Sequence, residues 1–245
     1  MSLNYSQLPS WLENNSIFRI LFLLRKLYLT KTRFSHHSQF AEDVSIIRLF
    51  DINYRGFFVD VGCFHPKKYS NTWLLYKNGW RGINIDIDPI KIDGFNIVRP
   101  HDINIASAVS NTEGKIAYYS NGFYSLTISL DEEFARGKMG YVKKTTQCAK
   151  LSHLIDGTKY RDRQIDFLSV DAEGHDLEIL ISLDFDRYNP KLIAVETHYA
   201  LFSEVEESSL YKFIISKDYC MVGWCGLTLL MANKSLQRTL ASSRR

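Results

Sequence analysis

Short apolar runs, most of them ending in an acidic residue, alternate with helix-forming segments along this chain of 245 residues. The clearest run is Phe57–Gly62, in which three apolar residues lead to Asp60 and then to a glycine. The other runs cover residues 82–86, 103–109, 165–171 and 191–196. Such runs are typical of strands that are buried on both faces of a parallel sheet. Strands that alternate with helices predict an α/β fold with right-handed crossover connections.

The segments between and after these runs fit the same architecture. Helices are expected over residues 73–79, 177–183 and 206–215, and directly after Asp88-Pro89. The segment 110–150 breaks the alternation, so we expect it to form an insertion beside the sheet. Two apolar segments, 219–222 and 227–231, predict an antiparallel hairpin at the sheet edge.

Charge and hydropathy divide the chain into three parts. We expect a basic, amphipathic helical extension over residues 1–37, a single globular domain over 38–235, and a basic, disordered tail over 236–245. The net charge is +3, but both ends are basic, so the body between them is mildly acidic. That balance argues against a nucleic-acid partner, which would require a continuous basic surface.

The N-terminal extension contains the most apolar run, residues 17–29, which Arg19, Arg25 and Lys26 interrupt. As a helix it would reach roughly 20 Å, short of the ~30 Å needed to cross a bilayer. Arg19, Lys26 and Arg33 recur every seven residues and would form a basic stripe on an apolar helix. Residues 16–33 are therefore expected either to associate peripherally with an anionic membrane surface or to pack on the domain.

The chain has four cysteines, and their spacing matches neither a disulfide scaffold nor a zinc site. We therefore expect them to be reduced in a cytoplasmic protein, with attachment to the inner membrane face through residues 16–33 as the alternative to a wholly cytoplasmic location.

Polar residues gather at the expected carboxyl ends of the strands, where open α/β sheets bind their ligands. The groups are Asp60-Val61-Gly62, Asp86, residues 171–175 and residues 196–198. One such acid alone would be explained by capping of the following helix, but several strand ends share the feature. Asp86, which closes the second strand, is suited to accept hydrogen bonds from ribose hydroxyls. Gly62 would let the backbone approach a ligand, and a helix beginning at Asn71 would offer free amides to a carboxylate.

The first strand is followed by Gly62-Cys63-Phe64-His65-Pro66, so the second and third glycines of a dinucleotide fingerprint are missing, and the chain has no Walker-type phosphate loop. A site for adenosine with an amino-acid tail, as in S-adenosylmethionine, remains.

Several motifs occur together in an order that makes a family resemblance specific. They are residues 38–43 (SQFAED), 58–66 (FVDVGCFHP), 70–72 (SNT) with 78–82 (NGWRG), 85–89 (IDIDP) and 170–176 (VDAEGHD). From residue 38 to the C-terminal hairpin, the chain resembles the FkbM family of S-adenosylmethionine-dependent methyltransferases. The resemblance implies the class I methyltransferase fold, which is Rossmann-like. In that fold a seven-stranded, mostly parallel sheet carries helices on both faces and a C-terminal antiparallel hairpin.

The resemblance also implies which residues bind the cofactor. They are Asp60, Gly62, Phe64, Asn71, Asp86 and Ser107. Asn71 would hold the methionine end, and Ser107 would lie beside the adenine.

Methyl transfer to a hydroxyl requires that the oxygen be placed near the methyl carbon and that its proton be removed. Asp171 is the first candidate for orienting or deprotonating the hydroxyl, with Glu173 and His175 as partners. Glu196 and His198 are further catalytic candidates from the neighbouring strand end. A Mg²⁺ ion held by these side chains is an alternative way to lower the pKa of the hydroxyl, although no residue spacing enforces a metal site.

The expected function is O-methylation of a carbohydrate hydroxyl, in a surface polysaccharide, a glycolipid or a nucleotide sugar. Two alternatives stay open: O-methylation of a polyketide or peptide, and a non-catalytic, membrane-associated scaffold that retains the fold. The partner expected of the enzyme is a small-molecule or glycan acceptor.

Overall fold

The computed structural model describes residues 15–28, 35–51, 53–122, 125, 128–130, 132–136 and 140–243. The chain divides into two units, Met1–Ser35 and His36–Arg245, which are described separately.

The described part of the first unit is helix α2, Ser16–Tyr28. The side chain of Asn15 caps it by accepting hydrogen bonds from the backbone N–H groups of Ile17 (3.0 Å) and Phe18 (3.1 Å). Apolar side chains of this helix are between 48% and 77% exposed: Ile17, Ile20, Leu21, Leu23, Leu24 and Tyr28. Arg33, the last residue of the expected basic stripe, lies outside the described residues. In the described part of the chain, every helix is too short or too polar to cross a bilayer.

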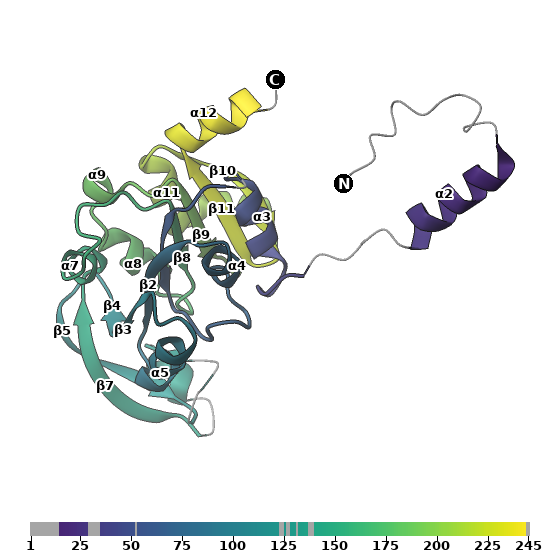
Figure 1. Cartoon of the computed structure of the whole chain (residues 1–245). Coiled ribbons are helices and arrows are strands. Elements are labelled where there is room, and N and C mark those ends of the chain that lie inside the picture. Colours follow the sequence, from purple (N-terminus) through teal and green to yellow (C-terminus); the bar gives the residue numbers. More distant parts are fainter. Residues whose placement is uncertain are drawn as a thin grey trace. The chain divides into compact units, whose positions relative to one another are not determined.

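The second unit is built on a seven-stranded sheet, coloured from blue through green to yellow in Figure 1. Its strands lie in the order β10-β11-β9-β8-β1-β2-β3. The parallel strands are β1 (Phe57–Val61), β2 (Arg81–Asp86), β3 (Ile103–Ala106), β8 (Phe167–Val170) and β9 (Leu192–Glu196). The antiparallel hairpin of β10 (Tyr219–Cys225) and β11 (Thr228–Asn233) completes one edge. The predicted α/β fold with its C-terminal hairpin is therefore confirmed.

Alternate residues of the buried strands point to opposite faces of the sheet and belong to two apolar layers, one on each face. On one face Phe57 and Val59 pack in a cluster with residues of α7 (Leu151–Asp156), α8 (Asp176–Ile181) and α11 (Ser209–Ser216). On the other face Phe58 packs in a cluster with residues of α3 (Glu42–Arg48), α4 (Trp73–Lys77) and α12 (Lys234–Ser243). The remaining helices beside the sheet are α5 (Pro89–Val98), α9 (Phe185–Tyr188) and α10 (Phe202–Glu207).

The insertion forms a second sheet of four strands in the order β4-β7-β5-β6. Its elements are β4 (Ala108–Val109), β5 (Gly114–Ser120), β6 (Ile128–Ser129), α6 (Glu132–Arg136) and β7 (Val142–Ala149). The strand expected over 103–109 is split at Ser107, whose backbone N–H still donates to Asp86 O (3.0 Å). Beyond Ser107 the chain leaves β2 and pairs with β7, so the insertion begins directly behind the end of β3.

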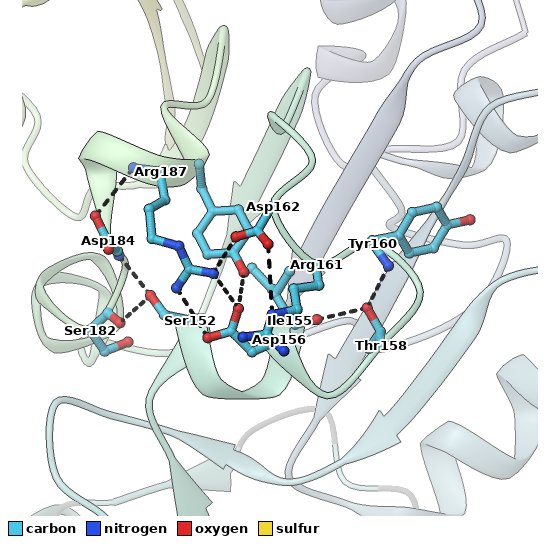
Figure 2. A network of polar contacts seen from close by, with 11 residues as sticks. Ser152, Ile155, Asp156, Thr158, Tyr160, Arg161, Asp162, Ser182, Asp184 and Arg187 are labelled. Atoms are coloured by element: carbon cyan, nitrogen blue, oxygen red, sulfur yellow. Dashed lines mark hydrogen bonds and ion pairs between the residues drawn. The ribbon is translucent and has the colours of Figure 1, made fainter.

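Polar contacts join the segments that precede β8 and β9, as Figure 2 shows. Arg187 donates to Asp156 Oδ1 (2.7 Å) and to Asp162 Oδ1 (2.6 Å), and the Tyr188 hydroxyl donates to Asp156 Oδ1 (2.5 Å). The hydrogen bonds from Arg187 and Tyr188 to Asp156 lower its pKa to about 2, and Arg187 has the larger effect. The network connects α7 to α9 near the amino ends of β8 and β9. The Asp156 carboxylate stays ionised over the physiological pH range.

The expectation of a disordered tail over 236–245 is wrong for residues 236–243, which belong to helix α12. Leu236 is only 4% exposed, and Leu240 packs against the same apolar cluster. The two leucines are four residues apart, so they lie on one face of the helix and anchor it despite its polar composition. Arg244 and Arg245 lie outside the described residues.

We predict that Leu236→Ala lowers the free energy of unfolding by about 2–4 kcal/mol, because it leaves a cavity in a close-packed layer. Arg238→Ala, on an exposed position of the same helix, is expected to change it by less than about 0.5 kcal/mol. Chemical denaturation of both variants measures the difference. Equal stability of the two variants would show that α12 does not anchor the domain.

Candidate active site

A cavity of about 330 Å³ opens at the carboxyl ends of the parallel strands. It lies where the chain, having run outward from β1 to β3, returns to the other side of β1 as β8. This reversal of strand order is where open α/β sheets bind their ligands. All the predicted cofactor residues line the cavity: Asp60, Gly62, Phe64, Asn71, Asp86 and Ser107. Most of the predicted catalytic residues line it too: Asp171, Glu173, His175 and Glu196.

His198 stands apart from this set. Its side chain is 61% exposed, and its Nε2 lies 3.7 Å from Glu196 Oε2. The residue follows β9 by two positions, after the buried Thr197, and lies outside the cavity lining. It contacts Glu196 of the site, and its charge also lowers the pKa of Asp176.

Gly62 has a backbone φ of +83°, and its Cα approaches the end of the neighbouring strand. A Cβ at this position would lie 1.7 Å from the backbone oxygen of Asp171. The structure thus gives a different reason for the glycine from the one expected. The absence of a side chain at Gly62 permits the close approach of β1 to β8. That approach brings the two halves of the cavity together.

Asp60 is buried at the end of β1 and accepts a hydrogen bond of 2.5 Å from the Thr72 hydroxyl. Burial raises the pKa of Asp60, whereas the Thr72 hydroxyl and the charge of Arg99 act in the opposite direction. The carboxylate therefore depends on its partners to remain charged.

Asp86 forms a buried ion pair with Lys91 of α5, with 3.3 Å between Asp86 Oδ2 and Lys91 Nζ. Its other oxygen accepts from the backbone N–H of Asp88 (2.8 Å). Burial raises the pKa of Asp86 to about 6, and Lys91 opposes this shift. The predicted ribose-binding carboxylate thus has a partner that the sequence did not reveal, because the pairing depends on how α5 packs beside β2.

Asn71 lies in the loop before α4, and its Nδ2 donates to Ser169 Oγ of β8 (3.3 Å). The expected helix N-terminus at Asn71 is not formed there. Helix α4 begins at Trp73 and is five residues long, and the Trp73 N–H donates to Ser70 Oγ (3.1 Å). If Asn71 binds a ligand, it does so through its side chain or its own backbone, since the dipole of so short a helix contributes little.

The carboxyl groups of Asp171 and Glu196 form a hydrogen-bonded pair across the ends of β8 and β9. Burial, the charge of Glu196 and the hydrogen bond to it raise the pKa of Asp171 well above its usual range. Burial also raises the pKa of Glu196. Two carboxyls in this contact repel each other when both are charged, so the contact favours a proton on one of them. Asp171 is nevertheless accessible from the cavity, so a ligand can reach the pair.

The loop after β8 is shaped by its own side chains. Asp176 accepts hydrogen bonds from the N–H groups of Ala172 (3.1 Å) and Gly174 (3.3 Å), and Glu173 has a positive φ of 52°. His175 contacts Ser110 Oγ through Nε2 at 3.0 Å. The loop therefore fixes Glu173 and His175 at the cavity, and His175 links it to the start of the insertion.

Residues that precede β1 also reach the cavity, and the strand-end pattern did not predict them as site residues. Glu42 accepts hydrogen bonds from the Phe40 N–H (2.7 Å) and from the Thr228 hydroxyl (3.3 Å). Phe40 and Tyr69 line the cavity and are each 47% exposed. The opening thus carries two accessible aromatic rings beside a set of carboxylates.

Within the described residues, no three His, Cys, Asp or Glu side chains are placed to hold a metal ion.

The sequence matches the family model of the methyltransferase FkbM domain over residues 60–219, which is more than half of the chain. The chain therefore belongs to the FkbM methyltransferase family and is an S-adenosylmethionine-dependent methyltransferase. A comparison with curated protein sequences finds no match.

The solved structures that are similar to this chain include two methyltransferases. A TehB-like SAM-dependent methyltransferase from Corynebacterium glutamicum is 12% identical, with 93% of this chain and 100% of that chain covered and a TM-score of 0.42. An O-methyltransferase from Bacillus cereus, in complex with SAH, is 12% identical, with 92% of each chain covered and a TM-score of 0.45.

The residues of the cavity fit the chemistry of S-adenosylmethionine. The volume of the cavity is within the range of small-molecule sites, roughly 300–1,000 Å³. Asp86 offers a carboxylate oxygen at the end of the second strand, and Ile85, Ile87 and Val109 supply apolar surface for a base.

We predict that Gly62→Ala destabilises the protein by at least about 3 kcal/mol, because the strained backbone and the collision with Asp171 O add together. Gly174→Ala is a matched control. Its φ is +92°, and a Cβ added there would have nothing within 4 Å. It should cost only the backbone strain of about 1–2 kcal/mol. Thermal and chemical unfolding compare the two, and equal losses would contradict the close approach of β1 and β8.

Proposed function

We propose that this methyltransferase is an O-methyltransferase and that its acceptor is a carbohydrate hydroxyl. The observation that carries the proposal is the Asp171–Glu196 carboxyl pair, which faces the cavity beside the predicted cofactor residues. A base with a raised pKa is suited to accept the proton of a hydroxyl group near neutral pH.

When bound, S-adenosylmethionine would supply a sulfonium methyl group that is open to in-line attack by the acceptor oxygen, with S-adenosylhomocysteine as the leaving group. The residues of this chain have two tasks in that reaction. Asp86 and Asn71, with Asp60, would hold the cofactor, and Asp171 would orient the acceptor hydroxyl. The Asp171–Glu196 pair takes up the hydroxyl proton as the C–O bond forms and the C–S bond breaks. Glu173 and His175 lie beside the pair and would bind the hydroxyl groups that do not react.

Support for a carbohydrate comes from the opening of the cavity. Sugar rings present apolar C–H faces that pack on aromatic side chains, and Phe40 and Tyr69 are exposed there. Sugar hydroxyls donate hydrogen bonds, and Glu42, Glu173 and Glu196 line the cavity as acceptors. A polyketide or peptide hydroxyl is the alternative acceptor, and the apolar residues Ile128 and Leu130 of the insertion line the same cavity.

We predict that Asp171→Asn lowers the rate of methyl transfer by about 100-fold or more, because the base is lost. The assay follows radiolabel from S-adenosylmethionine into a panel of sugars, glycolipids and hydroxylated polyketides. Binding of S-adenosylhomocysteine should persist in the variant. Glu207→Gln, an exposed carboxylate on α10, is the control and should retain the parent rate.

Glu196→Gln adds a test of the pair. Removing the neighbouring charge lowers the pKa of Asp171, so the acidic limb of the rate profile should move to lower pH. Label transfer only to polyketides would reject the carbohydrate acceptor. An Asp171→Asn protein that transfers methyl groups at the rate of the parent would reject the role of Asp171 as the base.

We further propose that helix α2 associates with an anionic membrane surface. Its apolar residues are exposed, and Arg25 is an exposed cation on the same helix. Such a helix lies in the interface with its apolar face in the lipid.

The protein should sediment with vesicles that contain phosphatidylglycerol and remain in solution with vesicles of phosphatidylcholine alone. Leu24→Glu is expected to abolish sedimentation, because it places a negative charge on the apolar face. Arg25→Gln should weaken sedimentation without abolishing it. A parent protein that does not sediment with the anionic vesicles would contradict the proposal.

A further inference from the structure

Arg99, the residue after α5, is fully buried, and its hydrogen bonds go to neutral acceptors. Its Nε donates to Pro66 O (3.0 Å) and its Nη2 to Ser70 Oγ (2.8 Å). Its Nη1 donates both to Thr72 Oγ1 (2.8 Å) and to Asn84 Oδ1 (3.1 Å). One guanidinium thus connects the loop after β1, the strand β2 and the end of α5.

Aromatic rings pack around the same group. The guanidinium carbon lies 5.0 Å from the ring centre of Phe95 and 5.5 Å from those of Trp73 and Tyr76. Cation–π attraction and the hydrogen bonds offset part of the cost of burying the charge. A position that merely fills space would not require a cation, so a charge buried here calls for a specific role.

The direction of the hydrogen bonds links Arg99 to the cofactor residue Asp60. Arginine can only donate, so Thr72 Oγ1 accepts from Arg99. The single hydroxyl proton of Thr72 is then free to be donated to Asp60 Oδ2, at 2.5 Å. Two consecutive hydrogen bonds through the Thr72 hydroxyl therefore connect the guanidinium of Arg99 to the buried carboxylate of Asp60.

The same contacts fix Asn71, because Arg99 holds the residues on both sides of it. Ser70 and Thr72 each accept from the guanidinium, and Ser70 also accepts from the Trp73 N–H. Asn71 lines the cavity between these two anchors.

We propose that Arg99 is a positioning residue of the cofactor site: through Thr72 and Ser70 it orients Asp60 and Asn71 toward S-adenosylmethionine. This inference rests on the proposed cofactor roles of those two residues. Arg99 lies outside the cavity lining and acts through its hydrogen-bonded neighbours and through its charge.

The charge environment of Asp60 agrees with this role. The groups that face its carboxyl are the Thr72 hydroxyl, Ser169 of β8, Arg99 and the buried thiol of Cys63. Burial raises the pKa of Asp60, and the first three groups lower it. Loss of the Thr72 hydroxyl would therefore make the carboxylate easier to protonate.

The test compares Thr72→Val with Thr72→Ser, using calorimetric titration of the whole protein with S-adenosylhomocysteine. Thr72→Val keeps the shape of the side chain but removes the hydroxyl that joins Arg99 to Asp60. The dissociation constant of S-adenosylhomocysteine should therefore rise about tenfold or more. Its affinity should also fall off at a higher pH than that of the parent. Thr72→Ser retains the hydroxyl and should restore both the affinity and the pH profile. Thr158→Val, at a threonine of the network in Figure 2, controls for the loss of a hydroxyl elsewhere.

Arg99→Lys is a second variant that keeps the charge but reaches fewer of the acceptors, and it too should bind at least about tenfold more weakly. Thermal unfolding confirms that each variant is folded. A folded Thr72→Val or Arg99→Lys protein with the parent affinity and pH profile would overturn the positioning role. A folded parent that binds no S-adenosylhomocysteine would instead reject the proposed cofactor site itself, so the two failures are distinguishable.

Discussion

The close approach of β1 and β8 at Gly62 is the constraint on which the site depends. Because Gly62 has no side chain, the Asp171 carbonyl can lie against its Cα, and the Asp171 N–H donates to Val61 O (3.0 Å). This contact brings the end of the first half of the sheet against the beginning of the second. The predicted cofactor residues on β1 and β2 thereby share one cavity with the carboxyl pair at the ends of β8 and β9.

Around that junction, several buried charges are held by specific partners. Asp86 has Lys91, Asp60 has Thr72 and Arg99, and Asp171 has Glu196. The first two arrangements favour a charged carboxylate, whereas the third raises the pKa of the group that would act as base beside the expected acceptor. Neighbouring acids at one sheet edge are thus suited to different tasks, because their surroundings move their pKa values by different amounts.

The sequence predicts the strand ends well because each buried strand is an apolar run whose last polar residue faces the crevice, as at Asp60, Asp86 and Asp171. It does not predict Lys91 or Arg99, since their partners depend on how α5 packs beside the loop after β1. The expectation of a disordered tail is wrong because the polar composition of that segment conceals the spacing of Leu236 and Leu240. Apolar pairs four residues apart are the signal that reveals such a helix.

The most direct test of this account is calorimetric titration of the protein and of Asp86→Ala with S-adenosylhomocysteine. The account predicts saturable binding to the parent and a loss of at least about tenfold in affinity in the variant, because the carboxylate that we propose accepts hydrogen bonds from the ribose hydroxyls is removed. A folded parent without binding, or a variant that binds as tightly as the parent, would contradict the assignment of this cavity as the cofactor site.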